Sequence, residues 1–302
     1  MNAAKQPDRI LAGIGWMLLT SLLFVGVTGI VRYLGSEMAA TQAAFIRYLV
    51  GLLLILPWML PLLRRPPSKQ QMGLYTLRGV AHGIGVTLWF YAMARIPIAE
   101  VTAIGYIAPI FVSVGAAVFL GETLKMRRIL AVIIAFCGTL IILRPGFQEL
   151  NLGQLAQLCA APVFAASFLL AKRMTDDSDP IAIVGMLSLF CTIVLLPGAI
   201  LHWRDPTIEE IGWLSLTAIL ATLGHVTMTK AFRCAPITVT QPVGFLQLVW
   251  ATILGVAAFG EPVDPFVLVG GGIIVASATY ISHREAMLAR RANTPPAAAT
   301  KL

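Results

Sequence analysis

Long apolar segments separated by short polar turns make up most of the chain between residues 10 and 281. A helix needs about 20 apolar residues to cross the hydrocarbon core of a bilayer. The pattern predicts ten spanning helices: Ile10–Val31, Ala39–Leu63, Met72–Ala94, Pro97–Leu120, Arg128–Leu143, Leu152–Ala171, Ile181–Leu201, Ile211–Phe232, Pro236–Phe259 and Phe266–Ile281. Turn chemistry rich in proline and charge, as in Arg64–Ser68 and Asp176–Pro180, separates them. The first segment is too long for a signal-peptide core, so we expect it to be retained.

The composition excludes most other classes. Hydrophobic residues make up 58% of the 302 residues and charged residues 12%, whereas soluble domains carry about 25% charged residues. Disordered chains are polar and charge-rich, so disorder is excluded as well. The four cysteines lie within or at the ends of apolar segments and show no disulfide framework. The sequence therefore predicts an all-α membrane protein with ten transmembrane helices and no folded soluble domain.

Positive charge is distributed unevenly between the predicted loops. The side of the N-terminal tail holds 16 Lys and Arg residues and the other side 4. Cytoplasmic loops carry the excess of Lys and Arg, so we expect a multi-pass protein of the cell inner membrane with both termini in the cytoplasm. The net charge of +8 is then explained by topology and by anionic lipid, and no nucleic-acid partner is expected.

The second half of the chain repeats the first at an offset of 139 residues. Tyr91–Ile98 resembles Lys230–Ile237, and the alignment continues without gaps. The aligned pairs are Gly85 with Gly224, Gly105 with Gly244, Tyr106 with Phe245, and Gly121-Glu122 with Gly260-Glu261. A unit of five helices is odd, so consecutive copies must enter the membrane from opposite sides.

The predicted organisation is therefore two inverted five-helix repeats, residues 1–145 and 146–285. They are followed by a cytoplasmic tail, residues 286–302, that is predicted to be disordered. Inverted repeats are typical of secondary transporters, in which the two halves exchange conformations and the substrate binds near the midplane where they meet. We expect alternating access around such a cavity.

Motifs along the first half resemble those of a known family. They are Tyr91–Pro97, Ala99-Glu100, Pro109–Phe111, Phe119–Thr123 and Gly138–Ile142, with Phe45–Tyr48 and Arg78-Gly79 as further points. The chain resembles the EamA domain of the drug/metabolite transporter superfamily over nearly its whole length. The second copy departs at two positions, where Met186 and Thr217 correspond to Arg47 and Arg78. The resemblance implies an exporter of small metabolites, most often amino acids, and the aromatic-amino-acid exporters are the nearest subtype.

Polar and aromatic residues at helical spacing predict the substrate site. Lipid offers polar groups no partner, so such stripes should face the bundle interior. The residues expected to offer apolar or stacking surface are Phe24, Trp89, Tyr106, Phe164 and Phe245. Those expected to form hydrogen bonds are His82, His225, Gln241 and Gln247. The alternative is that Ser and Thr in these stripes only join helices to one another.

Two arginines fall inside predicted spans. Arg47 lies about 12 Å into its span, at 1.5 Å per residue. A charge at that depth is costly and marks function by default, so Arg47 is a candidate for binding a substrate carboxylate; a structural role is the alternative. Arg78 is nearer the interface, which favours a side chain extended toward the polar headgroups, and it is kept as a candidate.

Ionisable groups other than arginine bear on proton coupling. His82 and His225 lie near the midplane, where imidazole can carry a proton or remain neutral as a hydrogen-bond donor. None of the 14 acidic residues falls in the middle of a span, and Glu100 is the nearest case. We therefore hypothesise weak or indirect proton coupling, through facilitated diffusion or a histidine relay.

Enzyme signatures are missing from the sequence, which has no HExxH, GxGxxG, GxxxxGK[ST] or nucleophile-elbow motif. No catalytic residue, metal site or cofactor is predicted. The expected partners are a small-molecule substrate and membrane lipid, and the expected state is a monomer. The alternatives are a carrier for another metabolite or a drug-like cation, a lipid scramblase or channel, and a membrane-embedded enzyme.

Overall fold

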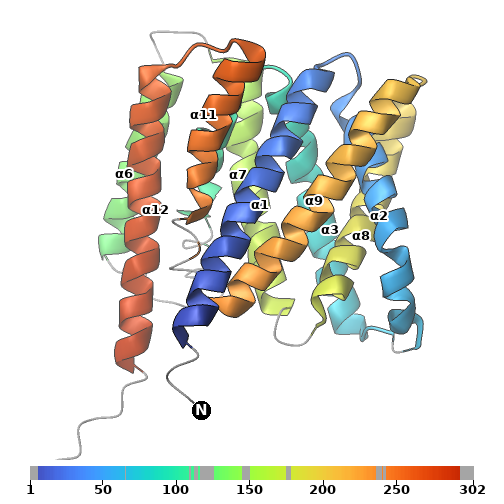
Figure 1. Ribbon diagram of the computed structural model, residues 1–302, viewed down its shortest axis with the longest axis horizontal. Helices are drawn as coiled ribbons and strands as arrows, with labels where there is room; N and C mark the ends of the chain where they lie inside the picture. Colours follow the sequence, from blue (N-terminus) through green and yellow to red (C-terminus); the bar gives the residue numbers. More distant parts are fainter. Residues whose placement is uncertain are drawn as a thin grey trace, which may run out of the picture.

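The structure is a computed structural model that describes residues 6–64, 66–108, 110–111, 115, 126–144, 150–174, 178–235, 240 and 243–292. These residues form one bundle of helices (Figure 1), which confirms the all-α prediction. The helices in the described part are α1 (Gln6–Leu34), α2 (Ala40–Arg64), α3 (Lys69–Met93), α4 (Ile98–Gly105), α6 (Met126–Leu143), α7 (Leu152–Met174), α8 (Pro180–Leu201), α9 (Ile208–Cys234), α11 (Leu246–Phe259) and α12 (Pro265–Ala292).

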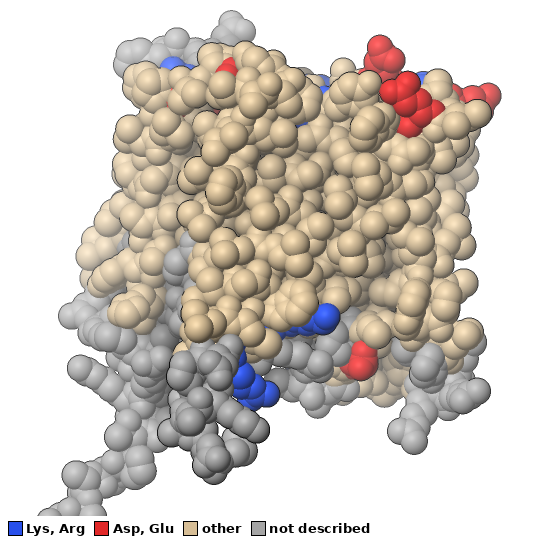
Figure 2. All heavy atoms as spheres, viewed as in Figure 1, with Lys and Arg blue, Asp and Glu red and all other residues tan. Residues whose placement is uncertain are grey.

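The two ends of the bundle differ from its middle. Helix α1 begins and α12 ends at the same end (Figure 1), which is called the near end here; the other is the far end. On the face shown in Figure 2, the described charged residues lie toward the two ends, and a broad uncharged band separates them. Large apolar side chains such as Leu53, Leu77 and Val269 are more than half exposed. An apolar exterior of this extent fits the hydrocarbon of a bilayer.

Length and hydropathy mark several helices as membrane-spanning. Among the described residues, five segments are long and apolar enough to cross a bilayer: Arg9–Leu34, Ala40–Leu60, Leu152–Ala171, Ile181–Leu201 and Ile208–Ala231. Shorter apolar helices are Ile133–Leu143, Leu246–Phe259 and Pro265–Ser277. Each of the eight overlaps one of the spans predicted from the sequence.

The packing of the helices has the symmetry of the repeat. Helix α1 packs on α9, and its counterpart α7 packs on α3, the counterpart of α9. Helices that correspond to each other also pack together, as α2 with α8 and α6 with α12, and α4 packs on α11, which belongs to the span that corresponds to its own. Helix α3 begins at the near end and α9 at the far end (Figure 1). The two five-helix units are therefore inverted relative to each other.

Matching caps start the two related helices. At the start of α3, Ser68 Oγ accepts from the Gln71 N–H, and Gln71 Oε1 accepts from the Ser68 N–H. At the start of α9, Thr207 and Glu210 form the same reciprocal pair. Both boxes satisfy backbone donors that a helix start leaves free. They are separated by 139 residues, the offset of the repeat.

The fourth and ninth predicted spans are not continuous helices, which corrects the expectation of unbroken helices over Pro97–Leu120 and Pro236–Phe259. Helix α4 stops at Gly105, and α11 starts only at Leu246. Proline has no N–H, so the proline at position 109 cannot donate to the Gly105 carbonyl. Both breaks fall at the symmetry-related Tyr106 and Phe245. Interrupted helices at a repeat interface are a feature of transporters.

The last helix is longer than predicted. Helix α12 continues to Ala292, past the predicted span edge at Ile281. It thus includes residues 286–292 of the tail that was predicted to be disordered. These residues are mainly Ala, Met, Leu and Arg, which have high helix propensity. Hydropathy marks only the apolar part of a helix, and so it does not detect a polar extension.

Candidate functional site

Four side-chain rings from four helices form a row in the interior of the bundle. Phe24 of α1 contacts His225 of α9, with ring centroids 5.3 Å apart. His225 faces His82 of α3 at 6.0 Å, and His82 contacts Phe164 of α7 at 5.2 Å. All three contacts are edge-on, at interplanar angles from 66° to 75°. This central ring row joins helices of both repeats.

Glycines make room for the two phenylalanines. A Cβ built on Gly85 of α3 would lie 3.0 Å from the Phe164 ring, and one built on Gly224 of α9 would lie 3.1 Å from the Phe24 ring. Gly85 and Gly224 are the pair aligned by the repeat. Each half therefore presents a phenylalanine to a glycine notch in the other half. The two glycines correspond in the repeat, whereas His82 and His225 do not, because Ala221 and Val86 occupy the corresponding positions.

A second aromatic contact lies where the interrupted helices meet. Tyr106 and Phe245, which correspond in the repeat, contact each other with centroids 4.9 Å apart and an interplanar angle of 78°. The Tyr106 hydroxyl points at the carbonyls of Gly244 and Phe245, 3.4 Å from each. Two related residues that touch each other must lie beside the pseudo-twofold axis. The pair thus marks the junction of the two halves.

The two arginines predicted from the sequence are buried in the bundle. Arg47 is 7% exposed and Arg78 is 5% exposed. Arg78 Nη1 donates to the Ile183 carbonyl in the first turn of α8 over 3.1 Å. The Arg47 guanidinium carbon lies 4.3 Å from the ring centroid of Tyr48. The Tyr48 ring is in turn 6.0 Å from His82.

The remaining predicted residues are distributed differently. Trp89 is half-buried and packs against Phe90, with centroids 5.3 Å apart, instead of joining the central ring row. Gln247 is half-buried in the first turn of α11. Gln241 lies outside the described residues. The structure thus brings Phe24, His82, Phe164 and His225 together, with Arg47 and Arg78 nearby and Tyr106 with Phe245 as a separate contact.

Sequence reasoning missed three polar contributors, which are Ser167, Tyr48 and Gln154. Ser167 Oγ is 3.1 Å from His82 Nδ1 and fixes that ring. Tyr48 lies between Arg47 and His82, and its position in the Phe45–Tyr48 motif could have drawn attention to it. Glu100 is buried at 8% exposure and accepts from Gln154 Nε2 over 2.6 Å. No spacing in the sequence places Gln154 beside Glu100, because the contact joins α4 to α7.

Ion pairs join the helices at the far end. Arg32 Nε of α1 lies 2.9 Å from Glu261 Oε1, and Glu261 Oε2 accepts from the Ile98 N–H that starts α4. Arg144 and Asp264 pair over 2.5 Å between α6 and α12. One carboxylate, Glu261, therefore ties α1 to the start of an interrupted helix. A network of this kind holds the far end of the bundle together.

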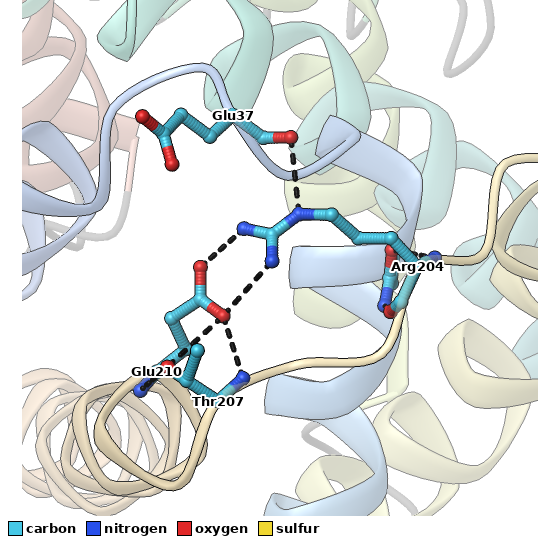
Figure 3. A network of polar contacts seen from close by, with 5 residues as sticks. Glu37, Arg204, Thr207 and Glu210 are labelled. Carbon is cyan, nitrogen blue, oxygen red and sulfur yellow. Dashed lines mark hydrogen bonds and ion pairs between the residues drawn. The ribbon is translucent and has the colours of Figure 1, made fainter.

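A second far-end network is centred on Arg204, as Figure 3 shows. Its Nε donates to the Glu37 carbonyl over 3.1 Å, and its terminal nitrogens pair with the Glu210 carboxylate. This hydrogen bond to Glu210 raises the pKa of Arg204 above its ordinary value. Glu210 also belongs to the capping box at the start of α9. The α1–α2 turn is thereby fixed to the α8–α9 turn.

A cavity of about 300 Å³ opens at the far end. Its walls come from the end of α1, the start of α2 and the end of α3, and include Thr41, Thr87, Phe90, Tyr91 and His202. The central ring row does not line it. On α3, the wall of this vestibule begins at Thr87, between one and two turns beyond His82. The vestibule therefore extends from the far end toward the central ring row.

Comparison with known proteins identifies the family. The EamA-like transporter family matches residues 11–144 and 151–283. A riboflavin transporter of Vibrio cholerae is 29% identical over 93% of this chain and 96% of its own. An S-adenosylmethionine uptake transporter of Rickettsia bellii is 27% identical over 94% and 97%. A pseudopaline exporter of Pseudomonas aeruginosa is 25% identical over 92% and 98%.

A solved crystal structure shares the fold, with a TM-score of 0.59 and 16% sequence identity over 96% of this chain and 100% of the other. The two family matches together cover nearly the whole chain and fall on the two halves separately. The relatives are transporters and not enzymes by name, in agreement with the absence of enzyme motifs. This chain belongs to the EamA-like transporter family, within the drug/metabolite transporters, and moves a small molecule across a membrane.

Proposed function

We propose that this protein is a secondary transporter of the bacterial inner membrane that exports small metabolites carrying a planar ring. Aromatic and hydrophobic amino acids are the first candidates. The observation that supports this best is the central ring row, in which Phe24, His225, His82 and Phe164 come from four helices and both repeats. Edge-on ring contacts are favourable, and the ring of a ligand can make the same kind of contact.

The mechanism we propose is alternating access. In the structure, α1 packs on α9 and α7 packs on α3 in related ways. If each pair can adopt the other's arrangement, the protein has two mirror-related states that open to opposite sides. A ring held between Phe24 and Phe164 would be reached first from one side and then from the other. The charge distribution of the loops supports placing the near end in the cytoplasm.

The names of the relatives favour a second candidate. Riboflavin and S-adenosylmethionine both contain a planar heteroaromatic ring, and the relatives named for them are similar to this chain along nearly its full length. A carrier for a nucleoside-like or flavin-like compound would use the same ring row. The relatives' names include both uptake and export, and so the direction is part of the test.

Counterflow in proteoliposomes tests the proposal. The purified protein is reconstituted into liposomes loaded with unlabelled substrate, and entry of labelled Trp, Phe, Met, riboflavin or S-adenosylmethionine is compared with that of Asp. We expect exchange of ring-bearing compounds and none of Asp. Riboflavin exchange without amino-acid exchange would select the second candidate. Inside-out vesicles from producing cells, with an imposed gradient, then give the direction.

Two variants locate the site. Phe24→Ala and Phe164→Ala should each lower exchange by about tenfold, because a lost ring contact together with its buried area exceeds about 1.4 kcal/mol. Phe136→Ala is the matched control, since Phe136 is 53% exposed on α6. Elution as a single species in size-exclusion chromatography checks folding. Unchanged exchange in both variants, with a folded protein, would remove the central ring row from the transport path.

A further inference from the structure

Two buried cations without an acidic partner lie beside the central ring row. Arg47 of α2 and Arg78 of α3 are both more than nine-tenths buried. The ion pairs in the described part of the chain join Arg32, Arg144 and Arg204 to carboxylates, and neither buried arginine takes part in one. A buried charge is costly unless it is paired and hydrogen-bonded. The protein therefore maintains positive charge here for which its described residues supply no counter-charge.

The hydrogen-bond capacity of the two guanidinium groups is also incompletely used. An arginine has five N–H donors. Arg78 Nη1 reaches the Ile183 carbonyl, and Arg47 lies over the Tyr48 ring. The Nε atoms of both residues are buried and have no hydrogen-bond partner among the described residues. A side chain extended toward the headgroups accounts for the contact of Arg78 with the Ile183 carbonyl. It does not account for the unpaired Nε atoms of Arg47 and Arg78.

The two arginines belong to one cluster. Both charges act electrostatically on the Tyr48 hydroxyl and on the Cys191 thiol. The Cys191 thiol donates to the Gly79 carbonyl over 3.5 Å and so joins α8 to α3 directly beside Arg78. The cluster lies between α2, α3 and α8. The Tyr48 ring under Arg47 is 6.0 Å from His82, and Arg78 precedes His82 by one turn of α3, so the two cations lie next to the central ring row.

The cluster is present in one half only. The corresponding residues of the second repeat are Met186 and Thr217, which are 5% and 0% exposed. The Thr217 hydroxyl is satisfied by the Trp213 carbonyl at 2.9 Å. The positive charge therefore lies on one side of the central ring row. A ligand with an apolar ring at one end and a negative charge at the other would bind in a single orientation.

We propose that Arg47 and Arg78 form an anion subsite that binds the carboxylate or phosphate group of the transported molecule, while the central ring row holds its planar ring. Guanidinium groups bind both anions through paired N–H donors. This inference rests on the proposed function and narrows it to anionic or zwitterionic substrates. It disfavours the drug-like cation considered from the sequence.

Matched ligand pairs test the subsite on the wild-type protein. Binding is measured by equilibrium dialysis of labelled compounds against the protein in lipid nanodiscs. Tryptophan is compared with tryptamine, which lacks the carboxylate, and riboflavin 5′-phosphate is compared with riboflavin, which lacks the phosphate. We expect the member that carries the carboxylate or phosphate to bind about tenfold more tightly or better in at least one pair, the size of a charge-assisted hydrogen bond. The pair that shows the preference identifies the anion.

Variants then assign the preference to the arginines. Arg47→Gln and Arg78→Gln should abolish it and leave binding of uncharged riboflavin unchanged, which also shows that the variant is folded. Arg47→Lys, which keeps the charge, should retain part of it. Arg173→Gln, at an exposed arginine, removes the same charge from the surface and should have no effect.

The outcomes separate the two proposals. Equal binding of both members of each pair by the wild type, or a preference that survives both Gln variants, would overturn the anion subsite while the ring-binding function stands. Equal loss of binding in the Gln variants for the members with and without the carboxylate or phosphate would also overturn it, because the arginines would then be structural. Absence of binding by all four compounds would overturn both proposals.

Discussion

The contact of α3 with α7 and the contact of α9 with α1 are two versions of one structure, and their differences show what the repeat preserves. Each has a phenylalanine in a glycine notch and a histidine at the ring, with centroid distances of 5.2 and 5.3 Å. In the α3–α7 contact, Ser167 also fixes His82, and Arg78 lies one turn away. The contacts between phenylalanine and glycine, which alternating access would exchange, occur in both halves. The polar groups Ser167 and Arg78 occur in one contact only.

Filling the glycine notches at Gly85 and Gly224 should have the largest effect on stability and on exchange. In Gly85→Val and Gly224→Val, the new side chain meets a phenylalanine ring that is already 3.0 or 3.1 Å from a Cβ position. Overpacking costs about 1–3 kcal/mol, so both variants should unfold at lower temperature and lose most exchange in proteoliposomes. The two losses should be similar, because the notches are equivalent.

A second pair of glycines that correspond in the repeat provides the controls for the two notch variants. Gly73 of α3 and Gly212 of α9 also correspond at the offset of 139, and a Cβ at either meets nothing within 4 Å. Gly73→Val and Gly212→Val carry the same cost in helix propensity without a clash. If they reduce exchange as much as the notch variants do, close packing is not the cause.

Breaking the far-end ion pair should have an intermediate effect on the α1–α9 side. In Arg32→Met, Glu261 loses its counter-charge, which should cost about 1–3 kcal/mol because the carboxylate is largely buried. We expect the vestibule to be open more often. The measurement is the rate at which a membrane-impermeant maleimide labels Thr87→Cys, in a background without the native cysteines.

Two further variants define that result. Arg173→Met removes an exposed arginine in the last turn of α7, which does not line the vestibule, and should leave the labelling rate unchanged. Exchange of the two charges, Arg32→Glu with Glu261→Arg, should restore part of the wild-type rate. A rate in Arg32→Met equal to that of the wild type would show that the ion pair does not control access to the far end.

Removing the hydroxyl that distinguishes the two histidines should have the smallest effect. Ser167→Ala deletes the 3.1 Å contact with His82 Nδ1, for an expected loss of about 0.5–1.5 kcal/mol in the free energy of unfolding. The α3–α7 contact then resembles the α1–α9 contact more closely. Thermal unfolding measures the loss of stability. Thr76→Ala, which removes an exposed hydroxyl on α3, is the control. A loss as large as that of Gly85→Val would mean that the hydroxyl is essential to the packing.

Much of the fold could be predicted from the sequence. Hydropathy predicts the helices, and the register of the repeat predicts that Gly85 corresponds to Gly224. The interruption of α4 and α11 was not predicted, because glycine and proline are common in continuous transmembrane helices too. Only the packing at Tyr106 and Phe245 shows where the helices break.

The candidate site could be predicted in part. Helical spacing correctly brings His82 and His225 to the interior, since polar groups avoid lipid. The same rule does not separate an inward-facing Trp from one that packs within its own helix, as Trp89 does against Phe90. Ser167 and Gln154 act through contacts between distant segments. Such partners depend on how helices are rotated against each other, which a single sequence does not encode locally.

The contact of Tyr106 with Phe245 has a consequence for the ancestry of the chain. In a dimer of identical half-length subunits, a residue on the twofold axis touches its own copy, and any mutation there changes both partners at once. Joining the halves in one polypeptide removes that constraint. Here one copy is Tyr and the other Phe, so the hydroxyl extends in one direction only, toward the Gly244 and Phe245 carbonyls. Gene duplication thereby made it possible for the two mirror-related conformations of the transporter to differ in free energy.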